Sequence, residues 1–299
     1  MHLGNARTAL LAWLDARAAG GAFVMRVEDL DAPRVVPGAE ARILEELAWL
    51  GLDWDEGPDR GGPFAPYRQS ERAARYDEAA RALLAKGAAF ECACSRAEVV
   101  RAASAPHPGE EGPRYPGTCR DLLPGEAAAR AKSAGRAPVL RFRAGAAEPF
   151  RDRLHGECAG EVDDFVIRRA DGVASYQLAV TVDDAAMGVT HVVRADDLLD
   201  STPRQLALYR ALGLRAPSFA HVPLVLAPEG ERLAKRNRPA ALGELRGSGV
   251  EPEVVAGALA ASAGLIARGT RIAARDLVAS FDLARIAREP AVLDAGALS

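Results

Sequence analysis

Residues Gly20–Arg34 read GGAFVMRVEDLDAPR, and this stretch decides which fold the sequence predicts. Apolar side chains dominate positions 22–27 after two glycines, which is typical of a strand covered on both faces, as in a parallel sheet. Ligands of open α/β sheets bind at the carboxyl ends of such strands. Five charged residues fall within the nine positions that end the stretch: Arg26, Glu28, Asp29, Asp31 and Arg34. They indicate either a polar ligand pocket or an ordinary acidic turn with local ion pairs.

Composition and length place the chain among globular proteins. It has 299 residues, 49% hydrophobic and 26% charged, which is enough for a sizeable core and two packed units. No run approaches the roughly 18 apolar residues of a membrane helix, and no signal peptide precedes the first predicted helix. The net charge of −3 neither indicates nor excludes a nucleic-acid partner, because a basic patch can lie on an acidic protein.

Helical and strand-like segments alternate along most of the chain. The helices are predicted at residues 5–19, 38–50, 70–86 and 202–212 and from residue 251 onward, with Ser70 and Thr202 as N-caps. Strands are predicted at Val139–Arg143, Asp164–Arg168, Ser175–Val182, Val189–Arg194 and His221–Leu226. A basic loop, Glu231–Arg238, follows the last of them. This alternation predicts an α/β fold.

Three of the four cysteines lie in a segment of different character, Phe90–Arg120. Uneven cysteine spacing argues against a disulfide framework, so we expect a reducing, cytoplasmic compartment and read Cys92, Cys94 and Cys119 as metal ligands. A structural zinc site needs four ligands, and the candidates for the fourth are Tyr115 and His107. The alternative is three reduced structural cysteines beside a core tyrosine.

Several ordered motifs resemble one known family. HLGNARTALLAWLDAR (residues 2–17) resembles the signature helix of class I aminoacyl-tRNA synthetases, and VEDLDAPR followed by VPGAEARILEELAWLGLDWDEGPD looks like their glutamyl branch. SYQLAVTVDDAAMGVTHVVRADDLLDSTPRQLALYRALG continues the match, and ERLAKRN stands where the second ATP signature is expected. The C-x-C…Y-x-x-x-C insert resembles that of the shortened subfamily that transfers glutamate to queuosine in tRNA(Asp).

The resemblance implies a four-part organisation of the chain. Residues 1–87 would form the first half of a Rossmann-like parallel-sheet catalytic core, and 88–138 a zinc-binding insert. Residues 139–240 would complete the core with its phosphate loop, and 241–299 would form a short helical region where longer relatives carry an anticodon-binding domain. We expect a monomer.

The resemblance also implies the chemistry. The enzyme would activate L-glutamate with ATP and Mg²⁺, without tRNA, and pass the glutamyl group to queuosine-containing tRNA(Asp). Zn²⁺ would be its resident metal. The residue roles carried over are ATP binding by His2, Gly4, Asn5 and Lys235, catalysis by His2 and Lys235, and glutamate binding by Glu28, Tyr176 and Arg194.

Physical chemistry agrees with these roles. A helix N-terminus at His2 suits a phosphate, and an arginine at a strand end can bind a carboxylate with two hydrogen bonds. The chain has only three lysines, Lys86, Lys132 and Lys235, so a lysine in the phosphate loop is informative. Taken singly, Tyr176 would be a core residue, Arg194 a surface ion pair and His2 a mobile terminus.

The sequence departs from the family pattern at two places. The family opens with a strand and loop close to RFAPSPTG before the HLGN helix, so we expect the native start to lie upstream of Met1, and weak folding and little activation without that strand. The phosphate loop reads Arg232-Leu233-Ala234-Lys235, in which Ala234 replaces a serine, so restoring serine is expected to raise the activation rate modestly.

Two other functions remain open from the sequence. One is a glutamyl-tRNA synthetase paralogue that charges the acceptor end of tRNA(Glu). The other is a non-catalytic tRNA-binding relic, which would show no glutamate-dependent ATP–pyrophosphate exchange.

Overall fold

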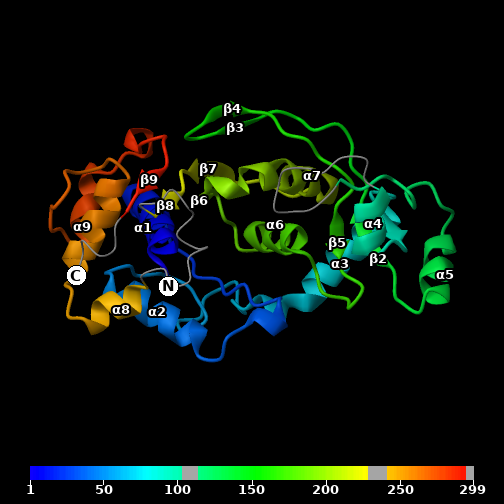
Figure 1. Ribbon diagram of the computed structural model, residues 1–299, viewed down its shortest axis with the longest axis horizontal. Helices are drawn as coiled ribbons and strands as arrows, with labels where there is room; N and C mark the ends of the chain where they lie inside the picture. Colours follow the sequence, from blue (N-terminus) through cyan, green and yellow to red (C-terminus); the bar gives the residue numbers. More distant parts are fainter. Residues whose placement is uncertain (103–113, 228–240, 294–299) are drawn as a thin grey trace.

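The computed structural model describes residues 1–102, 114–227 and 241–293 (Figure 1). Its α-helices are α1 (Leu3–Ala18), α2 (Ala39–Trp49), α3 (Ala73–Ala85), α4 (Arg96–Ala102), α5 (Glu126–Ser133), α6 (Tyr176–Ala186), α7 (Thr202–Leu212), α8 (Leu242–Gly247) and α9 (Pro252–Ser262). Its strands are β1 (Ala89–Cys92), β2 (Val139–Phe142), β3 (Phe150–Asp152), β4 (Gly156–Cys158), β5 (Val166–Arg168), β6 (His191–Ala195), β7 (Ser218–Val222), β8 (Val225–Leu226) and β9 (Ala291–Val292). The predicted α/β class is therefore confirmed.

Two pairs of these strands are parallel. β6 pairs with β7, with His191 opposite Ser218, and β8 pairs with β9 near the C-terminus. The other pairings between these strands are antiparallel, in the sheet β1-β2-β5 and in the β3–β4 hairpin. Strand β1 lies before residue 138 and strands β2 and β5 lie after it, yet all three form one sheet. The boundary predicted at residue 138, between the insert and the second half of the core, therefore remains a prediction.

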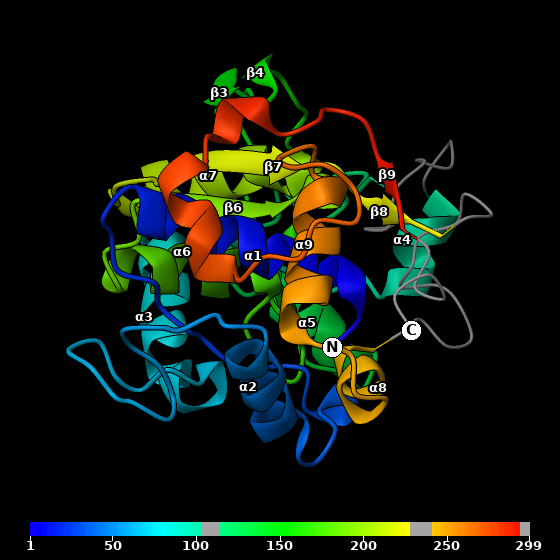
Figure 2. The same ribbon diagram turned by 90° about the vertical axis from the view of Figure 1, so that its left-hand side faces the viewer.

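Helix α1 forms the middle of the largest apolar cluster. Its residues Leu3, Leu10 and Leu14 are fully buried against helices α2, α8 and α9. Figures 1 and 2 show α9 running beside α1 while α8 lies beside α2, so the C-terminal region covers the first helix. Helical structure was predicted from residue 251 onward, and α9 confirms it for Pro252–Ser262. The described residues after α9 instead form two short 3-10 segments, Ala274–Ser280 and Leu283–Arg285, and strand β9, which was not expected.

The opening stretch does not form the regular buried strand that its sequence predicts. Residues 23–27 are half-buried and pair in parallel only at two isolated positions, where Met25 N–H donates to Glu56 O (2.8 Å) and Val27 N–H donates to Tyr67 O (2.9 Å). These two carbonyls come from separate parts of one loop. No continuous ladder can therefore form, although the direction of the chain is as predicted.

The strand predicted at Ser175–Val182 is wrong, because these residues begin helix α6. The Ser175 hydroxyl accepts a hydrogen bond from Leu178 N–H (3.4 Å) and caps the helix, so Tyr176 is its first residue and not part of a strand. Residues 177–184 are all buried. A helix buried on every side shows no amphipathic period, and β-branched residues such as Val180 and Val182 then favour a strand prediction.

Smaller differences concern caps and one proline. Helix α3 begins at Ala73, since Ser70 does not cap it but donates its hydroxyl to Asp29 Oδ2 (2.6 Å). Thr202 is the first residue of α7, and Ser201 precedes it as the cap. The strand predicted at His221–Leu226 is divided into β7 and β8 at Pro223, which has no N–H for a ladder.

Candidate active site

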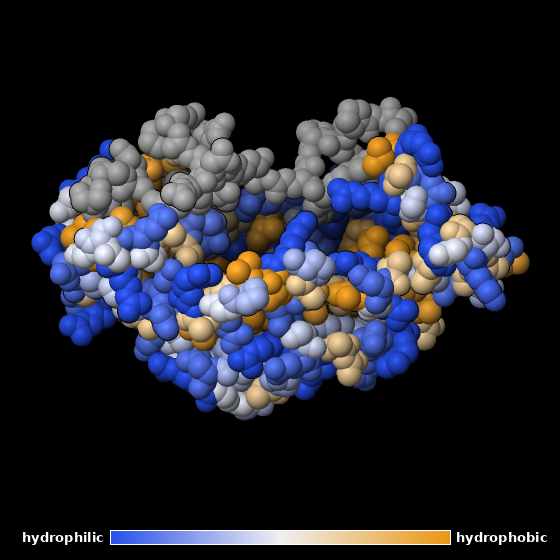
Figure 3. Space-filling model, turned by 60° about the horizontal axis from the view of Figure 1, so that its bottom comes forward, coloured by the Kyte–Doolittle hydropathy of each residue, from blue (hydrophilic) through white to orange (hydrophobic). Residues whose placement is uncertain are grey.

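A cleft of about 740 Å³ lies where the N-terminus of α1 meets the ends of β6 and β8. Five residues predicted to bind ATP or glutamate line it: His2, Gly4, Asn5, Glu28 and Arg194. The space-filling view shows the molecule hollowed in the middle of one long face, with hydrophobic and hydrophilic residues inside the hollow (Figure 3). The tertiary structure therefore brings together residues that are up to 192 positions apart in the sequence.

His2 caps helix α1 at the cleft. Its Nδ1 accepts a hydrogen bond from Asn5 N–H (3.2 Å), and a Cβ on Gly4 would lie 3.2 Å from the same Nδ1. Burial, and then the positive α-amino terminus, lower the pKa of His2, so its ring is neutral. With Nδ1 accepting, the proton of a neutral imidazole lies on Nε2, which is then a hydrogen-bond donor.

Glu28 is held by an arginine to which the sequence analysis gave no role. Arg26 Nη2 donates to Glu28 Oε1 (2.9 Å), and Arg26 Nη1 donates to Asp184 Oδ1 on α6 (2.6 Å). Burial opposes the charge on Arg26, but Asp184 and Glu28 outweigh it and raise the pKa of Arg26. Arg26 thus fixes one carboxylate oxygen of Glu28. The side chain of Glu28, which lines the cleft, remains 40% exposed.

Arg194 is buried at the end of β6, and its guanidinium makes both short and long hydrogen bonds. Three are short: Nε donates to His221 Nε2 (3.0 Å), Nη1 to Gln205 Oε1 (2.9 Å) and Nη2 to Thr202 Oγ1 (2.8 Å). Two are long, from Nη1 to Tyr176 OH (3.5 Å) and from Nη2 to Leu198 O (3.4 Å). The short bonds fix the plane of the group, and a carboxylate could replace the long ones with a bidentate pair.

Tyr176 lies beside Arg194, as the predicted glutamate site requires. Its side chain begins α6, stays partly exposed, and reaches Arg194 with its hydroxyl. Burial raises the pKa of this phenol, so Tyr176 is a neutral donor and acceptor. The sequence analysis missed Gln205, Thr202 and His221, because their spacing from Arg194 carries no motif.

The cysteine cluster forms a second candidate site, away from the cleft. The sulfur atoms of Cys92, Cys94 and Cys119 all lie within 4.8 Å of one another, with 3.7 Å between the Sγ atoms of Cys94 and Cys119. The hydroxyl of Tyr115 lies 3.3 Å from Cys92 Sγ and 3.9 Å from Cys94 Sγ. Zinc–sulfur bonds of about 2.3 Å in a tetrahedron separate the sulfurs by roughly 3.8 Å, so this donor set fits zinc.

The surroundings of the cluster disfavour ionisation of two of its side chains, Cys94 and Tyr115, when no metal is bound. Burial, and then the neighbouring Cys92, raise the pKa of Cys94 to about 12, and burial also raises the pKa of Tyr115. Burial opposes ionisation of Cys119 too, but the Ala93 N–H and the Tyr115 hydroxyl outweigh it and lower the pKa of this thiol. A divalent cation would favour the thiolates that burial alone disfavours.

Comparison with known proteins identifies the family. Residues 1–298 match the family model of tRNA synthetases class I (E and Q), catalytic domain. The chain belongs to this family of class I tRNA synthetases. It is 54% identical over 295 residues to the glutamyl-Q tRNA(Asp) synthetase of Symbiobacterium thermophilum, a match that covers 97% of this chain and 91% of that protein. It is 47% identical over 303 residues to the protein of the same name from Nitratidesulfovibrio vulgaris, with coverage of 100% and 93%.

A solved structure extends the comparison to the fold of the synthetase. The glutamate–tRNA synthetase of Elizabethkingia anophelis superposes with a TM-score of 0.84 at 30% sequence identity, covering 99% of this chain and 66% of that one. The resemblance noted in the sequence, to the glutamyl branch of class I synthetases, is therefore confirmed. The chain spans about two thirds of that larger enzyme and about nine tenths of the two glutamyl-Q relatives.

Some predicted site residues of the synthetase lie outside the described residues. These are Lys235, the rest of the phosphate loop, and the alternative zinc ligand His107. Their roles stay predictions. In the three described segments, no helix has both the length and the apolar character needed to cross a membrane.

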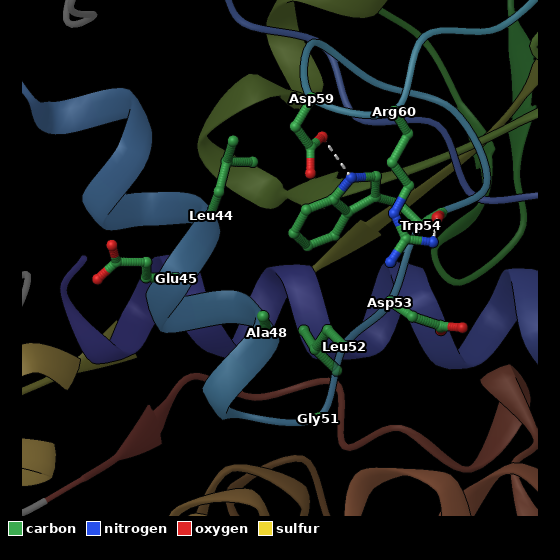
Figure 4. Close-up of a pocket in the computed structure, with 9 residues that line it drawn as sticks. All are labelled: Leu44, Glu45, Ala48, Gly51, Leu52, Asp53, Trp54, Asp59 and Arg60. Atoms are coloured by element: carbon green, nitrogen blue, oxygen red, sulfur yellow. Dashed lines mark hydrogen bonds between the residues drawn. The ribbon is translucent and has the colours of Figure 1, made fainter.

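A further cavity of about 550 Å³ lies between α2 and the loop that follows it (Figure 4). Trp54 Nε1 donates to Asp59 Oδ1 (2.8 Å), and the Arg60 guanidinium lies 5.4 Å from the centre of the Trp54 ring. None of the predicted site residues lines this cavity. Both contacts join residues of the loop to one another.

Proposed function

We propose that this synthetase activates L-glutamate with ATP to glutamyl-adenylate and pyrophosphate, and then transfers the glutamyl group to queuosine in the anticodon of tRNA(Asp). The observation that carries the proposal is the single cleft in which Glu28 and Arg194 face the N-terminus of α1. The names of the two relatives that match along nearly their whole length support the choice of acceptor.

Each polar group in the cleft has a role in this reaction. Arg194, with Tyr176 beside it, would bind a carboxylate of glutamate, and the free part of Glu28 would bind its ammonium group. The carboxylate that reacts attacks the α-phosphorus of ATP, and negative charge develops on the phosphoryl oxygens. His2 Nε2–H, together with the N-terminus of α1, would donate to those oxygens. Mg²⁺ would arrive with ATP, held mostly by the phosphates.

The first test is glutamate-dependent ATP–pyrophosphate exchange without tRNA. We expect exchange by the parent chain when it is extended upstream by the strand and loop expected before Met1, and loss of that exchange in Arg194→Met made in the same extended chain. Glu148→Ala removes an exposed ion pair with Arg210 and is the control that keeps activity. No exchange by the extended parent chain would overturn the proposal in favour of the non-catalytic tRNA-binding protein.

The acceptor is tested separately. Radiolabelled glutamate is offered with tRNA(Asp) that contains queuosine, with tRNA(Asp) that lacks it, and with tRNA(Glu). Labelling only of the first supports transfer to queuosine. Labelling of tRNA(Glu) would instead make the chain a glutamate–tRNA synthetase, which is the name that the larger Elizabethkingia enzyme carries.

The cysteine cluster would hold one Zn²⁺ through Cys92, Cys94, Cys119 and Tyr115, as a structural ion of the insert. Elemental analysis of the purified chain should find one zinc per molecule, and Cys94→Ser should lose most of it. Cys158→Ser is the matched control, because this fourth cysteine lies on β4 outside the cluster. Zinc content unchanged in Cys94→Ser would refute the site.

A further inference from the structure

We infer that the buried pair Asp152–His221 is a positioning device for Arg194, and that it sets the affinity of the cleft for glutamate; this inference rests on the proposed function. Neither residue lines the cleft. Both are fully enclosed, with side-chain exposures of 0%. They reach the site through His221 Nε2, which lies 3.0 Å from Arg194 Nε and 3.1 Å from Thr202 Oγ1, itself a hydrogen-bond partner of Arg194 Nη2.

The hydrogen bonds fix which nitrogen of His221 carries the proton. Asp152 lies at the end of β3, and its Oδ1 already accepts from the backbone N–H groups of Leu154 and His155, both at 2.9 Å. Its Oδ2 lies 2.7 Å from His221 Nδ1. A carboxylate can only accept, so Nδ1 must carry the hydrogen.

The same tautomer leaves Nε2 of His221 with its lone pair free to accept. Arg194 Nε–H is always a donor, since a guanidinium does not lose its proton in proteins. A hydrogen on Nε2 would therefore set two donors against each other at 3.0 Å. Burial and the charge of Arg194 lower the pKa of His221 in agreement with a neutral ring.

Holding Nε in this way turns the outer edge of the guanidinium toward the substrate. Thr202 and Gln205 take one hydrogen from each Nη, and the Arg194 guanidinium also lies 5.1 Å from the centre of the Phe219 ring. The two hydrogens with only long contacts, at 3.4 and 3.5 Å, are those left for a carboxylate. The β3–β4 hairpin, which packs on β7, thus reaches the glutamate site without touching it (Figure 1).

The discriminating variant is Asp152→Asn. Because Oδ1 must still accept from two backbone N–H groups, the amide NH₂ would face His221 Nδ1 and force the opposite tautomer, with a hydrogen on Nε2. We expect KM for glutamate in the exchange reaction to rise about 10- to 100-fold, as for loss of a hydrogen bond that orients a charged group. KM for ATP should stay within about twofold, since the pair reaches the cleft only through Arg194 and through Thr202, which holds Arg194. Glu157→Gln removes a charge from the exposed side of the same hairpin and should change neither constant.

A double-mutant cycle separates positioning from general damage to the fold. In the Arg194→Met background, Asp152→Asn should raise KM for glutamate no further, because its only route to the substrate is gone. Thr202→Val, with Thr202→Ser as its control, provides a second probe of the same clamp should Asp152→Asn unfold. An equal effect of Asp152→Asn on both substrates, or an additive effect in the double variant, would refute the inference.

Calorimetry of glutamate binding tests the positioning role of Asp152–His221 separately from the proposed function. If the parent chain binds glutamate and Asp152→Asn binds it equally well, the positioning role is refuted while the proposed function stands. If the extended parent chain neither binds glutamate nor catalyses exchange, the proposed function fails and this inference fails with it. Weaker binding of glutamate by Asp152→Asn, with unchanged binding of ATP, supports both.

Discussion

Asp183 on helix α6 is expected to be one of the most sensitive positions for folding. Its carboxylate is fully buried and accepts three hydrogen bonds, from Arg72 Nε (2.6 Å), Gln69 Nε2 (3.0 Å) and Tyr76 OH (2.7 Å). These donors come from the segment that leads into α3 and from α3 itself. Asp183→Ala would therefore detach that segment from α6.

The magnitude follows from what the substitution leaves behind. The side chain of Arg72 is 1% exposed, and without Asp183 it keeps only the carbonyl oxygens of Phe64 and Pro66, at 3.0 and 2.8 Å. Removing one partner of a buried ion pair costs about 3–5 kcal/mol, because the remaining charge stays uncompensated away from water. We expect Asp183→Ala to lower the free energy of unfolding by that amount.

Urea unfolding followed by circular dichroism measures this loss. The matched control is Glu148→Ala, since Arg210 and Glu148 form a similarly short ion pair (2.5 Å) whose side chains are more than half exposed. Such an exposed pair contributes at most about 1 kcal/mol. The double variant Arg72→Met with Asp183→Ala should recover part of the stability, because no unpaired charge remains. A loss in Asp183→Ala no larger than in Glu148→Ala would refute the reasoning.

Two further predictions test packing and protonation. Gly257→Ala on α9 would place its Cβ 1.8 Å from the backbone oxygen of Thr270 and should cost about 3 kcal/mol or more in unfolding free energy, whereas Gly247→Ala in α8, with open space around its Cβ, should change it by less than about 1 kcal/mol. Stability should also fall as pH drops below about 6.5, since burial lowers the pKa of His221 in the fold and the unfolded chain then binds a proton that the folded one excludes. His221→Gln should flatten the dependence of unfolding free energy on pH between 5 and 6.5. The control is His191→Gln, at an exposed histidine, which should leave that dependence unchanged. The same slope of unfolding free energy against pH in both variants would contradict the prediction.

Motifs alone were sufficient to select most of the predicted site residues that the structure brings into one cleft. His2, Glu28 and Arg194 were selected from ordered motifs, and all three line one cleft. Cys92, Cys94 and Cys119 were likewise proposed as metal ligands from their spacing, which left Tyr115 and His107 open as the fourth ligand. The three cysteines and Tyr115 do come together in the structure. Such residues can be predicted from the sequence because each lies in a local segment, such as a helix start or a strand end, whose neighbouring residues form a recognisable motif.

Other features depended on the tertiary structure. Helix α6 looks like a strand in the sequence, because a helix enclosed on all sides loses the polar face that marks its period. Residues 23–27 have strand-forming side chains, but the extent of their backbone pairing is limited by which loop carbonyls lie beside them. Propensity describes a residue's own preference, and these outcomes were decided by its neighbours in space.

The ion pairs and the histidine tautomer of the site show most clearly what the sequence determines and what the fold decides. The sequence determines that Arg26, Asp152 and His221 are present. Only the fold places Arg26 between Glu28 and Asp184, and only the fold brings Asp152 to His221, 69 residues away. A tautomer or a fixed guanidinium plane depends on the position of every hydrogen-bond partner to within a few tenths of an ångström. That precision comes from packing between distant elements, which no local pattern in the sequence records.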